Sequence, residues 1–104
     1  KMKIELLTTD KGYNLSNDNT TYFLNFGKFK TGEPQTAKLK FSEVNSKTFS
    51  LEPTCGCTTA EKRIISETEV EQTVIFNGKA PLPKTLIITN NKKQTQLKLN
   101  GDRV

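Results

Sequence analysis

The stretch Thr36-Ala37-Lys38-Leu39-Lys40-Phe41 alternates between polar and apolar side chains. A period of two predicts a β-strand with one buried face, because successive side chains of a strand point to opposite faces of the sheet. Leu39 and Phe41 therefore belong to a core, and the two lysines belong to the surface. This is the clearest strand pattern in the chain.

Segments on both sides of this stretch also have strand character. Residues 2–7 alternate, and residues 22–29 are rich in aromatic side chains, with Gly27 marking a bulge or bend. Alternation returns at 48–52, 70–76 and 97–99, and the apolar run 86–88 is typical of a strand covered on both faces. The region 13–15 is a brief extended piece within a polar loop. Residues 58–65 are compatible with a strand or a helical turn.

Turn signals such as Asn77-Gly78 separate these segments, and no amphipathic helix is present. About seven to eight short antiparallel strands predict an all-β protein with a β-sandwich fold. The 104 residues suit one sandwich at 22–104, preceded by an N-terminal strand or arm and a loop at 1–21. We expect the core to contain Phe26, Leu39, Phe41, Phe49, Leu51, Val74, Phe76, Leu86, Ile88, Leu97 and Leu99.

The charge pattern argues against several classes of partner. The chain has 16 Lys and Arg against 11 Asp and Glu, a net charge of +5, but the lysines are spread along it. No basic block is interleaved with aromatic residues, so we expect no nucleic-acid binding. No apolar run approaches the roughly 18–20 residues of a membrane span. No signal peptide is visible at the start.

Both cysteines lie in one short loop, Pro53-Thr54-Cys55-Gly56-Cys57-Thr58. Gly56 allows a tight turn because glycine reaches positive φ without steric cost. Two interpretations remain open: a redox-active or soft-metal site, or a pair of small apolar side chains that support the loop. Because bridged Cα atoms prefer separations of roughly 4.4–6.8 Å with a defined S–S dihedral, we expect a bridge between residues two apart to be strained and both thiols to be free under reducing conditions.

The chain lacks the side chains that would complete a metal-binding or catalytic site around this loop. The chain contains no histidine and no third cysteine, so one copy cannot build a tetrahedral zinc site. We therefore expect no metal, no cofactor and no catalytic residues, since no nucleophile has an evident base. The candidate binding residues are Thr54, Cys55, Gly56, Cys57 and Thr58.

A set of motifs resembles a known family. Phe26-Gly27-Lys28-Phe29, Gly32, Thr54-Cys55-Gly56-Cys57-Thr58, Thr89-Asn90 and Leu97-Lys98-Leu99-Asn100-Gly101 occur in its order and spacing. The family is a bacterial domain-of-unknown-function family with a Cys-Gly-Cys-Thr signature, similar to hydin-type immunoglobulin-like domains, with similar domains in phages. The resemblance implies an immunoglobulin-like sandwich without enzyme activity. Ser66-Glu67-Thr68-Glu69 replaces the family's usual Pro-Gly, and the export signal common among bacterial members is not visible.

Two functions follow from these observations. The first is a non-catalytic interaction or structural module of a larger assembly, such as a phage virion surface or a bacterial surface complex. Its partners would be proteins, including copies of itself, and its location a virion or the bacterial envelope or periplasm. The alternative is a thiol-dependent redox or copper-handling protein that uses Cys55 and Cys57.

Overall fold

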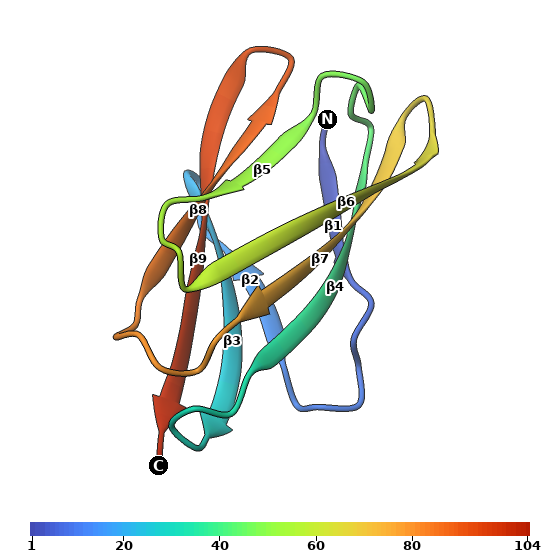
Figure 1. Ribbon diagram of the computed structural model, residues 1–104. Coiled ribbons are helices and arrows are strands. Elements are labelled where there is room, and N and C mark those ends of the chain that lie inside the picture. The colour runs from blue at the N-terminus through green and yellow to red at the C-terminus, as the bar shows by residue number, and fades with distance from the viewer.

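The computed structural model describes residues 1–104 and contains nine β-strands and no helix (Figure 1). In chain order the strands are β1 (Lys3–Leu6), β2 (Asn14–Asn17), β3 (Thr21–Phe29), β4 (Gln35–Ser42), β5 (Ser50–Pro53), β6 (Thr58–Ser66), β7 (Glu69–Phe76), β8 (Lys84–Asn90) and β9 (Lys93–Arg103). The all-β prediction is confirmed, with nine strands in place of the expected seven to eight. The ambiguous stretch 58–65 is a strand, and the brief extended piece near residue 14 belongs to β2.

The strands form two sheets that pack face to face as an immunoglobulin-like sandwich. The four-stranded sheet has the order β1-β4-β7-β6, and the five-stranded sheet has the order β2-β3-β9-β8-β5. The expectation of antiparallel strands is correct for every pairing except that of β3 with β9, which is parallel. These two strands are remote in sequence, and no hairpin constrains their relative direction.

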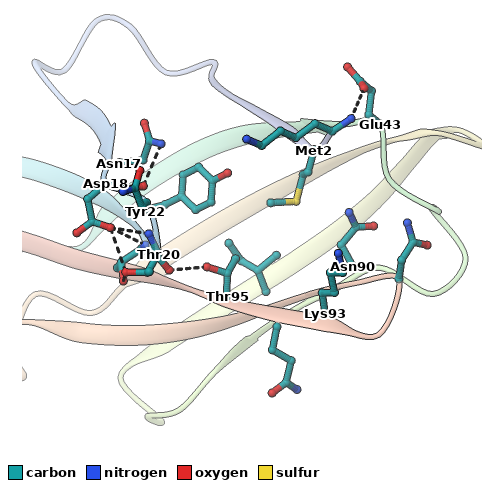
Figure 2. A pocket seen from close by; sticks show the side chains of 15 residues that line it. Met2, Asn17, Asp18, Thr20, Tyr22, Glu43, Asn90, Lys93 and Thr95 are labelled. Carbon is teal, nitrogen blue, oxygen red and sulfur yellow. Dashed lines mark hydrogen bonds and ion pairs between the residues drawn. The ribbon is translucent and has the colours of Figure 1, made fainter.

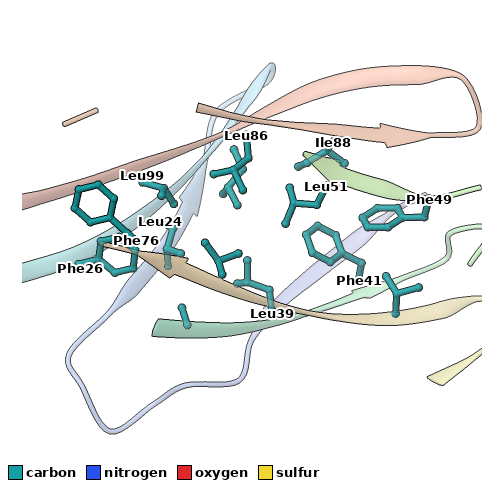
Figure 3. Packing of buried hydrophobic residues seen from close by; sticks show 14 of the residues in the cluster. Leu24, Phe26, Leu39, Phe41, Phe49, Leu51, Phe76, Leu86, Ile88 and Leu99 are labelled. Carbon is teal, nitrogen blue, oxygen red and sulfur yellow. The ribbon is translucent and has the colours of Figure 1, made fainter. Parts of the chain in front are cut away.

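The space between the sheets holds the core (Figure 3). All eleven core residues predicted from the alternation are buried, and Leu24, Phe29, Val44 and Val70 are buried with them. The rings of Phe41 and Phe49 pack with their centroids 4.7 Å apart. The apolar run 86–88 departs from its prediction, because Ile87 faces outward and is only half-buried while Leu86 and Ile88 are buried.

Gly27 forms the bulge that the sequence predicts in β3. Its φ is 70°, and the register between β3 and β9 shifts between Asn25 and Lys28. The Asn25 side chain accepts a hydrogen bond from the Gly27 N–H at 2.7 Å. The extra residue reverses the inside–outside alternation, so Phe29 reaches the same buried face as Phe26.

Residues 1–21 contribute one edge strand to each sheet. Strand β1 pairs with β4 in the four-stranded sheet, and β2 pairs with β3 in the five-stranded sheet. Each of these two strands is four residues long. The remaining sheet edges are β5, also four residues long, and β6, which has nine residues.

Candidate functional site

The predicted cysteine loop connects β5 to β6 and so crosses from one sheet to the other. The Thr54 hydroxyl donates a hydrogen bond to the carbonyl of Thr85 at 2.8 Å, which fastens the loop to β8. The backbone N–H of Asn77 donates to the carbonyl of Cys57 at 2.9 Å, which fastens it to the end of β7. The loop is therefore held at both ends by the sandwich.

A disulfide bond joins Cys55 to Cys57. The sequence analysis expected this bridge to be disfavoured, and the structure forms it with the two Cα atoms 5.2 Å apart, within the usual range for bridged cysteines. The prediction that Gly56 adopts a positive φ to make a tight turn is wrong, since Gly56 is not among the glycines with positive φ. A three-residue bridge therefore forms without a left-handed residue at its centre.

The five predicted binding residues differ in exposure. Cys57 and Thr58 are buried, Cys55 is half-buried, and only Thr54 and Gly56 are exposed. No group of three or more His, Cys, Asp or Glu side chains is placed to hold a metal ion. The structure thus packs the end of this loop between the sheets and leaves its centre exposed, and its role in binding stays a prediction.

The long free edge of the four-stranded sheet is β6. One side of this strand pairs with β7 over its length, and its other side has no strand beside it. Ile64 and Ile65 near its end are 54% and 40% exposed, an unusual state for isoleucine. Figure 1 shows β6 and β7 extending together beyond the body of the sandwich. The edge therefore presents unpaired backbone groups beside apolar side chains.

Charged side chains flank these isoleucines on both faces of β6. Lys62 is paired in register with the buried Gln72, so it lies on the inner face, and its ammonium donates to the carbonyl of Phe49 at 2.7 Å. On the outer face Arg63 donates to Glu71 at 2.8 Å. This hydrogen bond holds the pKa of Glu71 below its usual value. Both cations are therefore ordered by the sandwich.

A cleft of about 750 Å³ opens elsewhere, at the end of the sandwich where β8 joins β9 (Figure 2). Its lining comes from the turn between β2 and β3, from the β8–β9 hairpin, from the chain just before β1 and from Glu43 just after β4. Sequence reasoning missed this cleft because its residues come from four distant segments. In sequence, the asparagines and threonines that line it are ordinary turn formers.

Comparisons with known proteins add one weak structural likeness. No protein-family model matches the sequence, and no curated protein matches it. Among solved structures, the chain is similar to domains 4 and 5 of the S-layer protein SbsC, with a TM-score of 0.47 and 16% sequence identity. The alignment covers 96% of this chain and 54% of that one, so the chain spans about half its length. The resemblance to the Cys-Gly-Cys-Thr family stays a prediction.

The fold and its free edge define the class of protein to which the chain belongs. It is an immunoglobulin-like β-sandwich of two sheets around a single core. The structure contains no helix with the length and apolar character that crossing a bilayer requires.

Proposed function

We propose that this chain is a non-catalytic module that joins proteins in a larger assembly, such as a virion surface or a bacterial surface complex. The observation that carries the proposal is the free edge of β6, nine residues long, with exposed isoleucines near its end. The other three edge strands have four residues each. Short edges are poor templates for strand pairing, whereas a long free edge accepts a partner's strand readily.

The occupant that fits this edge is an extended segment of a partner protein. Backbone hydrogen bonds to β6 would supply affinity, and side chains facing Ile64 and Ile65 would supply specificity. Lys62 and Arg63 lie beside the isoleucines, and the chain carries a net charge of +5. Charge complementarity therefore favours a segment with apolar residues flanked by carboxylates.

The absence of catalysis is part of the proposal. The chain has no histidine, the side chain that most often acts as a general base near neutral pH. Two acidic residues of the neighbouring strand β7 are engaged on the sheet surface: Glu71 binds Arg63, and Glu69 lies 3.1 Å from Lys40. These contacts suit a solvated sheet face better than a reaction centre.

Site-specific photo-crosslinking in the native assembly tests the proposal. Benzoylphenylalanine replaces Glu61 on β6 or, as the control, Glu5 on β1; both glutamates are exposed and lie on opposite edges of the same sheet. We expect the position-61 variant to form one dominant adduct with an extended peptide of a partner, and the position-5 variant to form none. Equal adducts from both positions, or none from position 61, would contradict the proposal.

Thiol chemistry remains a second candidate function because of one observation, the bond between Cys55 and Cys57 in a loop where Cys55 is half-buried. Counting free thiols before and after mild reduction, with assembly measured in parallel, tests this candidate. If assembly depends on the redox state while the β6 crosslink is lost, thiol control replaces strand addition as the leading function. If assembly is the same in both states, the bridge serves the loop alone.

A further inference from the structure

The inward rows of three adjacent strands become polar where they reach the cleft. On β3 the row runs from Phe26 through Leu24 to Tyr22, and the first two are buried while Tyr22 is half-buried. On β9 the buried Leu99 and Leu97 are followed by Thr95, and on β8 the buried Leu86 and Ile88 are followed by Asn90. An uninterrupted core would continue with apolar residues at these positions. The three strands therefore form a polar mouth to an apolar core.

Two of these inward groups lie at the boundary between the core and the cleft. The side-chain oxygen of Asn90 is buried but has no hydrogen-bond partner. Leaving such a group unpaired costs about 1–3 kcal/mol, so a retained one calls for a partner that the chain does not supply. The hydroxyl of Tyr22 points into the open space of the cleft, and Met2 enters it from the side of the other sheet (Figure 2).

The walls of the cleft are fixed by hydrogen bonds within the chain. The carboxylate of Asp18 accepts the backbone N–H groups of Thr20 and Thr21, both at 2.8 Å. These donors hold the pKa of Asp18 below its usual value. The hydroxyl of Thr95 donates to the carbonyl of Thr20 at 2.7 Å and so ties β9 to the β2–β3 turn. These walls therefore need little reorganisation, and a ligand requires only that the Asn90 side chain turn its buried oxygen toward the cleft.

The hairpin on the other side is equally well defined. Asn91 and Lys92 have φ values of 51° and 66°. Positive φ at both central residues is the signature of a tight two-residue turn that matches the twist of its strands. This turn sets Asn90 and Lys93 opposite each other at the end of the hairpin. Asn90 therefore lies at the end of β8, where it is paired with Lys93 across the hairpin.

The chemistry of the lining identifies the ligand class. Only three of the 15 lining residues are hydrophobic, which argues against an apolar ligand. The residues that line the cleft include Asn17, Asn19, Asn90, Asn91 and Gln94, and of their amides only those of Asn17 and Gln94 donate to groups of the chain, Asp18 and Thr89. An amide offers both donors and an acceptor without net charge, which matches a sugar hydroxyl that donates and accepts at once.

Charge does not favour an ionic ligand. The lining includes both cations and anions, with Lys93 on one wall and Asp18 and Glu43 on others. Glu43 is already paired with Lys3 at 3.3 Å, and Asp18 is engaged in its turn. The volume of about 750 Å³ lies within the usual range for small-ligand sites. The Tyr22 ring adds a flat apolar surface that suits the C–H face of a sugar ring.

We propose that this cleft binds a neutral oligosaccharide, with Asn90 and Tyr22 as its central contacts. The inference goes beyond the proposed protein-joining role and uses a different surface. The Asn90 oxygen accepts from a sugar hydroxyl, and the ring of Tyr22 packs against the sugar.

A glycan array that carries neutral and acidic oligosaccharides, probed with the full chain, tests this inference. We expect binding to neutral glycans, with the best array glycan shifting the amide resonances of residues 17–22 and 90–95 in a two-dimensional NMR titration. N90A and Y22A should each weaken this binding about tenfold or more, because each removes a central contact.

Asn14→Ala is the matched control, since Asn14 is exposed on β2 and does not line the cleft. Thermal melts of all variants separate loss of binding from loss of folding, and Y22F retains the ring if Y22A is unstable. Three results would overturn the inference: no neutral glycan binds, only acidic glycans bind, or binding is unchanged in N90A and in a folded variant at Tyr22.

Discussion

Gly78 lies where the connection after β7 meets the turn between β3 and β4. Its φ is 76°, and its carbonyl accepts a hydrogen bond from the N–H of Gly32 at 2.9 Å. A Cβ added at Gly78 would collide with the backbone of Glu33, whereas one added at Gly32 or Gly56 would meet nothing. The three glycines therefore differ in whether their surroundings leave room for a side chain.

Substituting these glycines by alanine should separate backbone strain from steric overlap. Gly56→Ala should be almost neutral because its φ is ordinary and its surroundings are open. Gly32→Ala, at a φ of 84°, should cost about 1 kcal/mol of unfolding free energy. Gly78→Ala should cost about 2–4 kcal/mol because the collision adds to the strain. Chemical denaturation measures all three, and equal effects at positions 32 and 78 would contradict the close approach.

Gln72 and Gln35 are both buried glutamines, but only one is satisfied. The side-chain oxygen of Gln72 has no hydrogen-bond partner. The Gln35 oxygen accepts from the hydroxyl of Tyr13 at 2.8 Å, and its nitrogen donates to the carbonyl of Glu33 at 2.9 Å. Burial of an unpaired polar group is costly, and burial of a paired one is nearly neutral.

The same substitution should therefore have opposite effects at these two positions. Gln72→Met removes an unpaired oxygen and should raise the free energy of unfolding by about 1 kcal/mol. Gln35→Met leaves the Tyr13 hydroxyl and the carbonyls of Glu33 and Pro34 without this partner and should lower the free energy of unfolding by about 1–2 kcal/mol. Urea unfolding curves of both variants provide the comparison. A clear loss of stability in Gln72→Met would show that its oxygen does have a partner.

Strand β6 has a free edge that can accept another strand, and it carries a charged residue that opposes pairing between copies. The exposed side chains of Ile64 and Ile65 favour pairing with another strand, but Lys62 on the inner face places a positive charge in the same stretch. Inward-pointing charges on edge strands are a common protection against unwanted pairing between copies. Lys62 thus restricts the partners that β6 accepts while leaving its backbone free.

Replacing Lys62 by valine should remove that protection. Lys62→Val leaves Ala60 and Ile64 on one face of the edge with no charge between them, so the variant should self-associate more strongly than the natural chain in sedimentation velocity. Loss of the bond to Phe49 should change stability by only about 1 kcal/mol. Lys3→Val, which removes the same charge from the opposite edge strand β1, is the control. If both variants associate equally, Lys62 has no special role.

Strand pattern and core composition were accessible from sequence because they depend on local alternation. Leu39 and Phe41 show this alternation directly, and Gly27 within a strand pattern predicted the bulge. Phe29 was missed as a core residue because the bulge reverses the alternation after it. The β6 edge was missed because strand order depends on pairings between remote segments.

Asn90 shows the same limit for the cleft. In sequence it is a turn residue before Asn91, and only the packing of β8 beside β9 and across from Met2 gives its side chain a cavity. The disulfide was missed for a local reason. We expected a bridge between residues only two apart to be strained, and the structure forms it with the Cα atoms 5.2 Å apart.

For the whole molecule, the two proposed surfaces lie toward opposite edges of the four-stranded sheet. Strand β6 forms one edge, and the cleft borders the chain just before β1, which forms the other. A partner strand on β6 and a glycan in the cleft would therefore not compete for space. Such a module would join a protein assembly through one side and contact a glycan through the other.

Hydrogen exchange of β6, compared between the isolated chain and its native assembly, tests the strand-addition account most directly. Amides on the free side of an edge strand exchange quickly, whereas amides that bond to an added strand are protected. We expect the outward-facing amides within 59–65 to slow by about tenfold or more in the assembly, while β1 and β2 remain unchanged. Unchanged exchange along β6, or protection that appears at β1 or β2 instead, would contradict the account.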